Sequence, residues 1–109
     1  EDLARTAAKE DIDYIISGAG MPISLPEFAK GSSVKLIPVI SSARGASLLL
    51  KTWKRRYNRF PDALIVEGPL SGGHIAGYNL EQLRSLKEKM RKEPLLENSV
   101  KDVLGLVRE

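Results

Sequence analysis

The chain has 109 residues, 42% of them hydrophobic and 28% charged, a composition that suits one globular domain with a single core. It contains no cysteine, which excludes a disulfide framework, a Cys-ligated zinc site and a cysteine nucleophile. The 17 basic and 14 acidic side chains give a net charge of +3, too small an excess to indicate a nucleic-acid partner. No apolar run approaches the roughly 18 residues of a membrane span, and the first residues lack the pattern of a secretory signal, so we expect a cytoplasmic protein without a membrane partner.

The first half of the chain is predicted to contain two strands. A stripe of Leu3 and small residues follows Asp2, which predicts a short helix with Asp2 as its N-cap. Strands are predicted over residues 12–16 and 34–40, with a short helix in the loop between them. Their apolar residues are mostly continuous rather than alternating, which is typical of parallel strands buried on both faces.

The second half is predicted to contain one strand and three helices. Ser42 is the expected N-cap of an amphipathic helix over residues 43–57, whose apolar stripe consists of Ala46, Leu49, Leu50, Trp53 and Tyr57. A third strand is predicted over residues 63–66. Asn79 and Gln82 resemble a capping box for a helix that must end at Pro94, and Ser99 with Asp102 indicates the start of a last helix.

This alternation of strands and helices predicts an α/β fold with three parallel strands and flanking helices. Because three strands leave two open edges, we interpret residues 1–109 as a single partial-barrel domain. It would hold the central βα units of a (β/α)8 TIM barrel of about 250 residues. The open edges are expected to permit a homo-oligomer.

The segments that follow the three predicted strands are the candidate functional site, because the active face of such folds lies at the carboxyl ends of the strands. Gly18 and Gly20 follow the first strand, and Gly72, Gly73 and His74 follow the third. His74 is the only histidine and is the side chain best matched to proton transfer, although a surface histidine is the alternative. With no second histidine and no cysteine, no metal site is expected.

Several common motifs are excluded by their spacing. The third glycine of a dinucleotide-binding loop that starts at Gly18 would fall at Ile23, and neither a P-loop nor a Gly-x-Ser-x-Gly elbow occurs. A cluster of five cations near the end of the helix over residues 43–57 is interpreted as a solvated outer face; its members are Lys51, Lys54, Arg55, Arg56 and Arg59.

The segment from Glu67 to His74 resembles the nitronate monooxygenase family, also called 2-nitropropane dioxygenase-like, whose members are FMN-dependent (β/α)8 barrels. The resemblance extends through residues 13–22, 35–42, 53–57 and 61–63, so it covers nearly the whole chain. It implies oxidation of alkyl nitronates by O2 to a carbonyl compound and nitrite, with FMN as the cofactor and a small molecule as the substrate.

The same resemblance implies roles for particular residues. His74 matches the catalytic histidine that acts as general base or positions the substrate. The residues implied in cofactor binding are Gly18, Ala19, Gly20, Ser71, Gly72 and Gly73. The first strand of such barrels and the later glycine-rich loops that hold the FMN phosphate have no counterpart in these 109 residues. The isolated chain is therefore expected to carry the histidine without the phosphate site, and to be inactive.

Two alternatives stay open at this point. The flavin-dependent enoyl-acyl carrier protein reductases share the Gly72-Gly73-His74 element, although they are less similar around Pro69 and Leu70. A non-catalytic α/β binding module, with the basic helix end contacting an acidic partner or nucleic acid, is the alternative from another class of protein.

Overall fold

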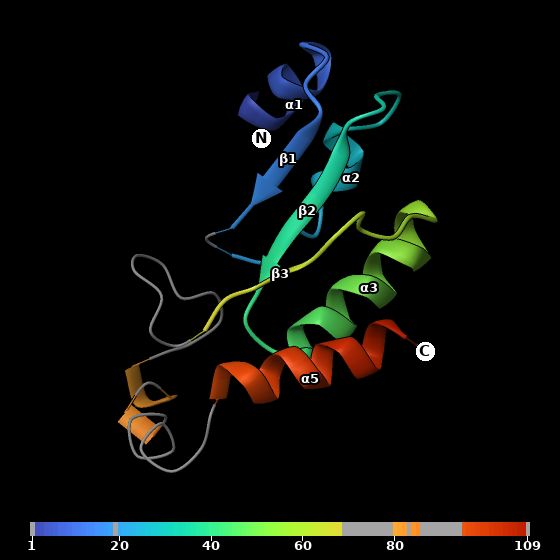
Figure 1. Ribbon diagram of the computed structural model, residues 1–109. Coiled ribbons are helices and arrows are strands. Elements are labelled where there is room, and N and C mark those ends of the chain that lie inside the picture. Colours follow the sequence, from blue (N-terminus) through green and yellow to red (C-terminus); the bar gives the residue numbers. More distant parts are fainter. Residues whose placement is uncertain (1, 19, 69–79, 83, 86–94, 109) are drawn as a thin grey trace.

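A computed structural model describes residues 2–18, 20–68, 80–82, 84–85 and 95–108 of the chain (Figure 1). Its helices and strands are, in chain order, α1 (Asp2–Lys9), β1 (Tyr14–Ser17), α2 (Leu25–Phe28), β2 (Lys35–Ile40), α3 (Ala43–Tyr57), β3 (Ile65–Val66) and α5 (Leu95–Val107). Residues 80–82 and 84–85 are also helical. Among the described residues, no helix is both long and apolar enough to cross a membrane.

The three strands form one parallel sheet in the order β1-β2-β3. Ile16 of β1 is the register partner of Ile37 of β2, and Val39 of β2 is the partner of Ile65 of β3. The predicted α/β fold with three parallel strands and flanking helices is therefore confirmed. The sequential order of parallel strands is that of neighbouring βα units in a barrel.

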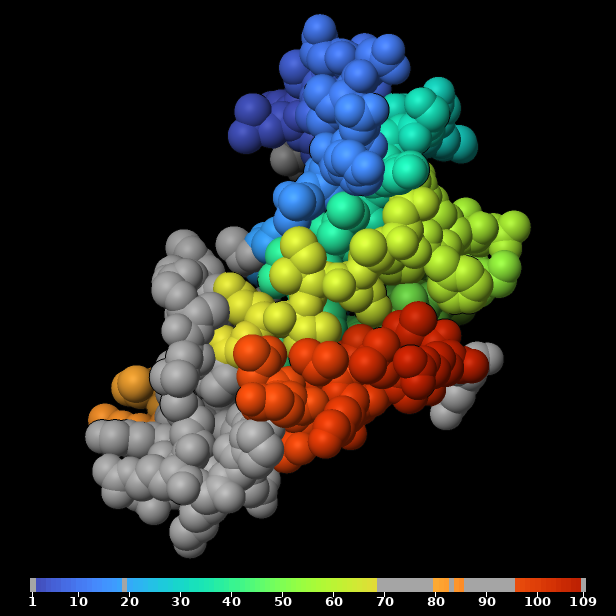
Figure 2. Space-filling model, in the orientation of Figure 1, coloured from blue at the N-terminus to red at the C-terminus, as the bar shows by residue number. Residues whose placement is uncertain are grey.

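The hydrophobic core lies between one face of this sheet and the helices. Leu36 and Ile40 of β2 are almost fully buried, as are Leu49 and Trp53 of α3. Val103 of α5 joins the same core cluster. Figure 2 shows the β3 segment (yellow) between the rest of the sheet and α5 (red), and α5 contacts both β3 and α3. Burial of this one face is the main stabilising contribution to the fold.

The opposite face of the sheet is open, which corrects the expectation that the strands are buried on both faces. Tyr14 and Ile16 of β1 are 55% and 61% exposed, and Ile65 of β3 is 39% exposed. Their register partners on β2 share this face, because paired residues of parallel strands point to the same side. The continuous apolar runs thus give the sheet a second face that no described helix covers and that is apolar apart from Lys35, which lies over the Tyr14 ring.

The observed start of α3 agrees with the predicted start, whereas the starts of α1 and α5 differ from the predictions. Ser42 is the N-cap of α3, and its hydroxyl accepts a hydrogen bond of 3.1 Å from the Gly45 N–H. α1 already includes Asp2, so this carboxylate lies in the first helical turn, where it interacts favourably with the helix dipole, and is not the N-cap. α5 begins at Leu95, four residues before Ser99, directly after the proline that cannot continue a preceding helix. The helix predicted between Asn79 and Pro94 lies largely outside the described residues.

All three strands are shorter than predicted, and β2 begins at Lys35, one residue after its predicted start. β1 begins at Tyr14, because the chain first turns through Asp11, which has a positive φ of 56°. β3 is limited to Ile65 and Val66. Near the amino end of β2, Asp62 forms the hydrogen bonds that a longer β3 would otherwise form with Leu36. The Asp62 N–H donates to the Leu36 carbonyl at 3.0 Å, and the Asp62 carboxylate accepts from the Leu36 N–H at 2.8 Å. The Asp62 side chain therefore replaces a neighbouring strand as the hydrogen-bond acceptor for this part of β2.

Candidate functional site

Gly18 and Gly20 lie at the carboxyl end of β1, at the edge of the sheet where the site is expected. Gly18 directly follows the strand and is exposed. A Cβ atom built on Gly18 would lie 3.4 Å from the side chain of Val39, so this position borders the open face of the sheet. Gly20 has a φ of +132°, a conformation that side chains other than glycine rarely adopt. A Cβ at Gly20 would meet no atom within 4 Å, which leaves room beside the backbone.

The loop after β1 is anchored to α3 by a buried tryptophan. Trp53 is fully buried and its indole Nε1 donates a hydrogen bond of 3.2 Å to the carbonyl of Pro22, 31 residues away in sequence. At the other end of α3, the Met21 side chain lies 3.5 Å from where a Cβ of Gly45 would be. These two contacts hold the segment that begins with Gly18 and Gly20 against the helix.

The carboxyl ends of β2 and β3 are also held at this edge of the sheet. β2 leads through the buried Ser41 directly into α3. After β3, the Glu67 N–H donates to the Ile40 carbonyl at 2.8 Å. A Cβ on Gly68 would lie 3.3 Å from the Leu96 side chain, so glycine allows the chain to pass close to α5. The last described residues before position 69 therefore lie beside the end of β2.

The structure places two of the seven predicted site residues, Gly18 and Gly20. Ala19 and the predicted residues after β3, which are Ser71, Gly72, Gly73 and His74, lie outside the described residues. The part of the chain that is described contains no group of three or more His, Cys, Asp and Glu side chains arranged to hold a metal ion. The described site is thus a backbone-lined rim of glycine and serine beside an apolar sheet face.

Sequence reasoning did not identify the link between Trp53 and the loop after β1, because it placed Trp53 only in the core. A signal for such a link exists in the side chain itself. A buried indole N–H needs a hydrogen-bond acceptor, which directs attention to a carbonyl near the helix. Sequence alone does not indicate that this carbonyl belongs to Pro22, since the partner depends on how the loop folds back.

Comparison with known proteins gives one clear result. A search of curated proteins found no significant match. The family model described as nitronate monooxygenase matches residues 3–106, which is nearly the whole chain and includes every described element except the ends of α1 and α5. Together with the parallel βα units and the glycine rim, this match establishes that the chain belongs to the nitronate monooxygenase family.

Proposed function

We propose that the chain forms part of a flavin-dependent oxidoreductase that converts alkyl nitronates and O2 to a carbonyl compound and nitrite, with FMN as its cofactor. The observation that carries this proposal is the family match over residues 3–106. The position of Gly18 and Gly20 at the carboxyl end of β1 supports it, since (β/α)8 enzymes build their sites at this end. We also propose that β1, β2 and β3 are neighbouring strands of such a barrel. The interior of the barrel would then cover the open face of the sheet, on which Tyr14, Ile16 and Ile65 lie.

The described residues fit a flat aromatic ring. Gly18 has no side chain above Val39, and the space beside Gly20 is open within 4 Å, so a ring could approach the backbone closely. Val39 lies beside Gly18 at the carboxyl end of the open face, and its apolar side chain provides a surface on which the edge of a ring system can lie. When bound, FMN supplies the redox chemistry that no side chain of the protein can provide.

The chain's own residues would then orient the reactants and handle the proton. By their resemblance to the family motif, Ser71, Gly72 and Gly73 line the flavin ring and the substrate pocket. His74 donates a hydrogen bond that holds a nitronate oxygen or, where a neutral nitroalkane binds instead, removes the proton from the carbon that bears the nitro group and so forms the nitronate. An imidazole suits both roles, because its ordinary pKa lies close to neutral pH. In this proposal Trp53 positions the loop that carries Gly18 and Gly20 through its bond to Pro22.

A titration with two flavins tests the proposal without requiring turnover. The full chain is titrated with riboflavin and with FMN, following the quenching of flavin fluorescence. If the FMN phosphate is held outside residues 1–109, as the family resemblance implies, the two flavins should bind with dissociation constants within about threefold of each other. A phosphate contact would instead make FMN bind more tightly than riboflavin, by about tenfold in the dissociation constant for each 1.4 kcal/mol that the contact contributes.

Two substitutions at one position provide the matched control. Gly18→Ala adds only a Cβ at ordinary contact distance from Val39 and should leave the affinity nearly unchanged. Gly18→Phe places a ring over the same face and should abolish saturable binding. His74→Ala should alter the fluorescence of the bound flavin. Absence of saturable binding to the unsubstituted chain, or equal binding by the Gly18→Phe variant, would overturn the proposed flavin site at the carboxyl end of β1.

A further inference from the structure

A cleft of about 680 Å³ lies at the opposite end of the sheet from the glycine rim. It is formed by the turn between α2 and β2 and by the end of α3 with the residues that follow it, which lie at the same end of the molecule in Figure 1. Four of its lining residues are cations: Lys30, Arg55, Arg56 and Arg59. Among the described lining residues, Glu27 is the single acidic one. The lining residues therefore sum to a charge of +3, which Asp62, paired with Arg59 just outside the lining, partly offsets.

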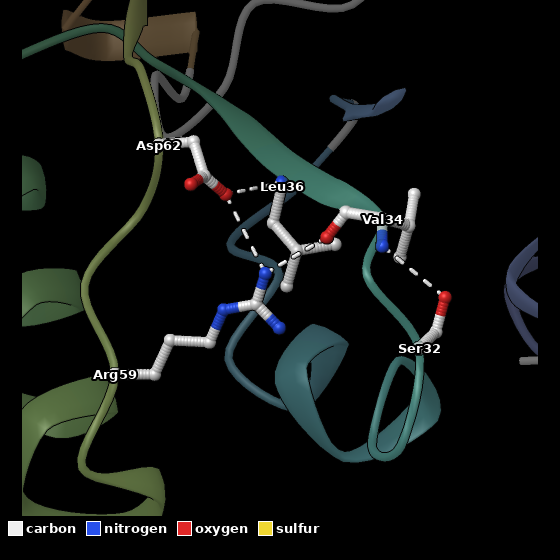
Figure 3. Close-up of polar contacts among 5 residues, drawn as sticks. All are labelled: Ser32, Val34, Leu36, Arg59 and Asp62. Carbon is white, nitrogen blue, oxygen red and sulfur yellow. Dashed lines mark hydrogen bonds and ion pairs between the residues drawn. The ribbon is translucent and has the colours of Figure 1, made fainter. Parts of the chain in front are cut away.

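Arg59 is held in place by the protein before any ligand arrives. Its Nη2 donates to the Val34 carbonyl at 2.9 Å and lies 3.4 Å from the Asp62 carboxylate. Figure 3 shows both contacts on one terminal nitrogen, while the other terminal nitrogen points away from Asp62. A guanidinium that is already ordered loses less conformational entropy when it binds an anion. Its side chain remains 29% exposed, so it is accessible.

The helix dipole does not explain the whole cluster. Cations near the end of α3 are favourable because of the partial negative charge there, which accounts for Arg55 and Arg56. Lys30 and Arg59 come from other segments and converge on the same cleft. By contrast, Lys54 donates to Asn58 at 2.6 Å and lies over the Phe60 ring at 5.4 Å, and it does not line the cleft.

The cleft also has an apolar wall. Pro26 and Ala29 are buried residues at its edge, and Tyr57 is half-buried beside the arginines. Its volume lies within the range of about 300–1,000 Å³ typical of small-molecule sites. Arginine matches the geometry of phosphate oxygens through paired N–H groups.

We propose that this cleft binds a small phosphorylated organic molecule, with its phosphate on the arginines and Lys30 and its apolar part against the half-buried Tyr57. The site is separate from the glycine rim and does not depend on flavin binding. Phenyl phosphate is a suitable probe, because it combines a phosphate group with an aromatic ring.

The test is a titration of the isotope-labelled full chain with phenyl phosphate at constant ionic strength, followed by amide chemical shifts. We expect saturable shifts at residues 30–32 and 55–59. The Arg55→Gln and Arg56→Gln double variant should raise the dissociation constant at least about fivefold. The Arg44→Gln and Lys51→Gln double variant removes the same charge from exposed positions of α3 outside the cleft and should change the constant less than twofold.

Three results would overturn the proposal. One is an equal loss of affinity in the two double variants, which would show a general effect of net charge. Another is a set of shifts that does not saturate or that lies at the carboxyl ends of the strands. The third is a single-stranded DNA oligonucleotide that shifts residues 30–32 and 55–59 when phenyl phosphate does not, which would indicate a nucleic-acid surface instead.

Discussion

Replacing Asp62 with alanine should destabilise the fold by about 2–3 kcal/mol, because one carboxylate joins the loop before β3 to the edge of β2 (Figure 3). The variant leaves the N–H of the fully buried Leu36 without its 2.8 Å acceptor. An unsatisfied buried donor costs about 1–3 kcal/mol. The lost pairing with Arg59 adds at most about 1 kcal/mol, since the two side chains are 29% and 41% exposed and water screens the pair.

Equilibrium unfolding in urea, followed by circular dichroism, measures this loss. Asp62→Asn is the matched control, because an amide oxygen can still accept from Leu36 while the charge is removed, and its loss should stay below about 1 kcal/mol. A loss of the same size in both variants would show that charge, and not the acceptor, stabilises this part of the chain. A loss below about 0.5 kcal/mol for Asp62→Ala would refute the reasoning about Leu36.

Three further predictions concern the core, the loop after β1 and the open sheet face. Leu49→Ala should cost about 2–5 kcal/mol in urea unfolding, since the side chain is fully buried, and a loss under about 1 kcal/mol would contradict its place in the core. Trp53→Phe removes the hydrogen bond to Pro22, so it should lower stability by about 1–3 kcal/mol. It should also shift the amide signals of the residues on either side, at positions 20, 21, 23 and 24, and unchanged signals there would contradict the anchoring role. The open face should make the chain self-associate, so its mass in sedimentation should rise with concentration, and Ile16→Lys should reduce that rise. Leu3→Lys, at an exposed helical position, should not reduce the rise in mass. An equal effect of the two substitutions would exclude the open sheet face as the surface of self-association.

The sequence predicted the elements of the fold well because their signals are local. The stripe of α3 and its N-cap depend on residues within one helix, and both are confirmed at Ser42, Leu49 and Trp53. The apolar runs likewise indicated three parallel strands. These runs could not indicate that one face of the sheet is open. A strand can have the same continuous apolar sequence whether its second face is covered or exposed.

The candidate site was harder to predict where it depends on contacts between distant segments. Gly18 and Gly20 were identified because glycines that follow a strand are a local pattern, and both lie at the carboxyl end of β1. The bond from Trp53 to Pro22 spans 31 residues and the bond from Asp62 to Leu36 spans 26, so neither has a local signal. The cleft at the other end of the sheet was missed for the same reason. Lys30 and Arg59 meet there only after the chain has folded.

The most direct test of the central claim is to locate bound riboflavin on the full chain by amide chemical shifts. The proposed flavin site predicts shifts at residues 17, 18 and 20, at 39–42 and at 67–68, which lie at the carboxyl ends of the three strands. Shifts confined to residues 30–32 and 55–59, or no saturable shift at all, would contradict a flavin site at this end of the sheet.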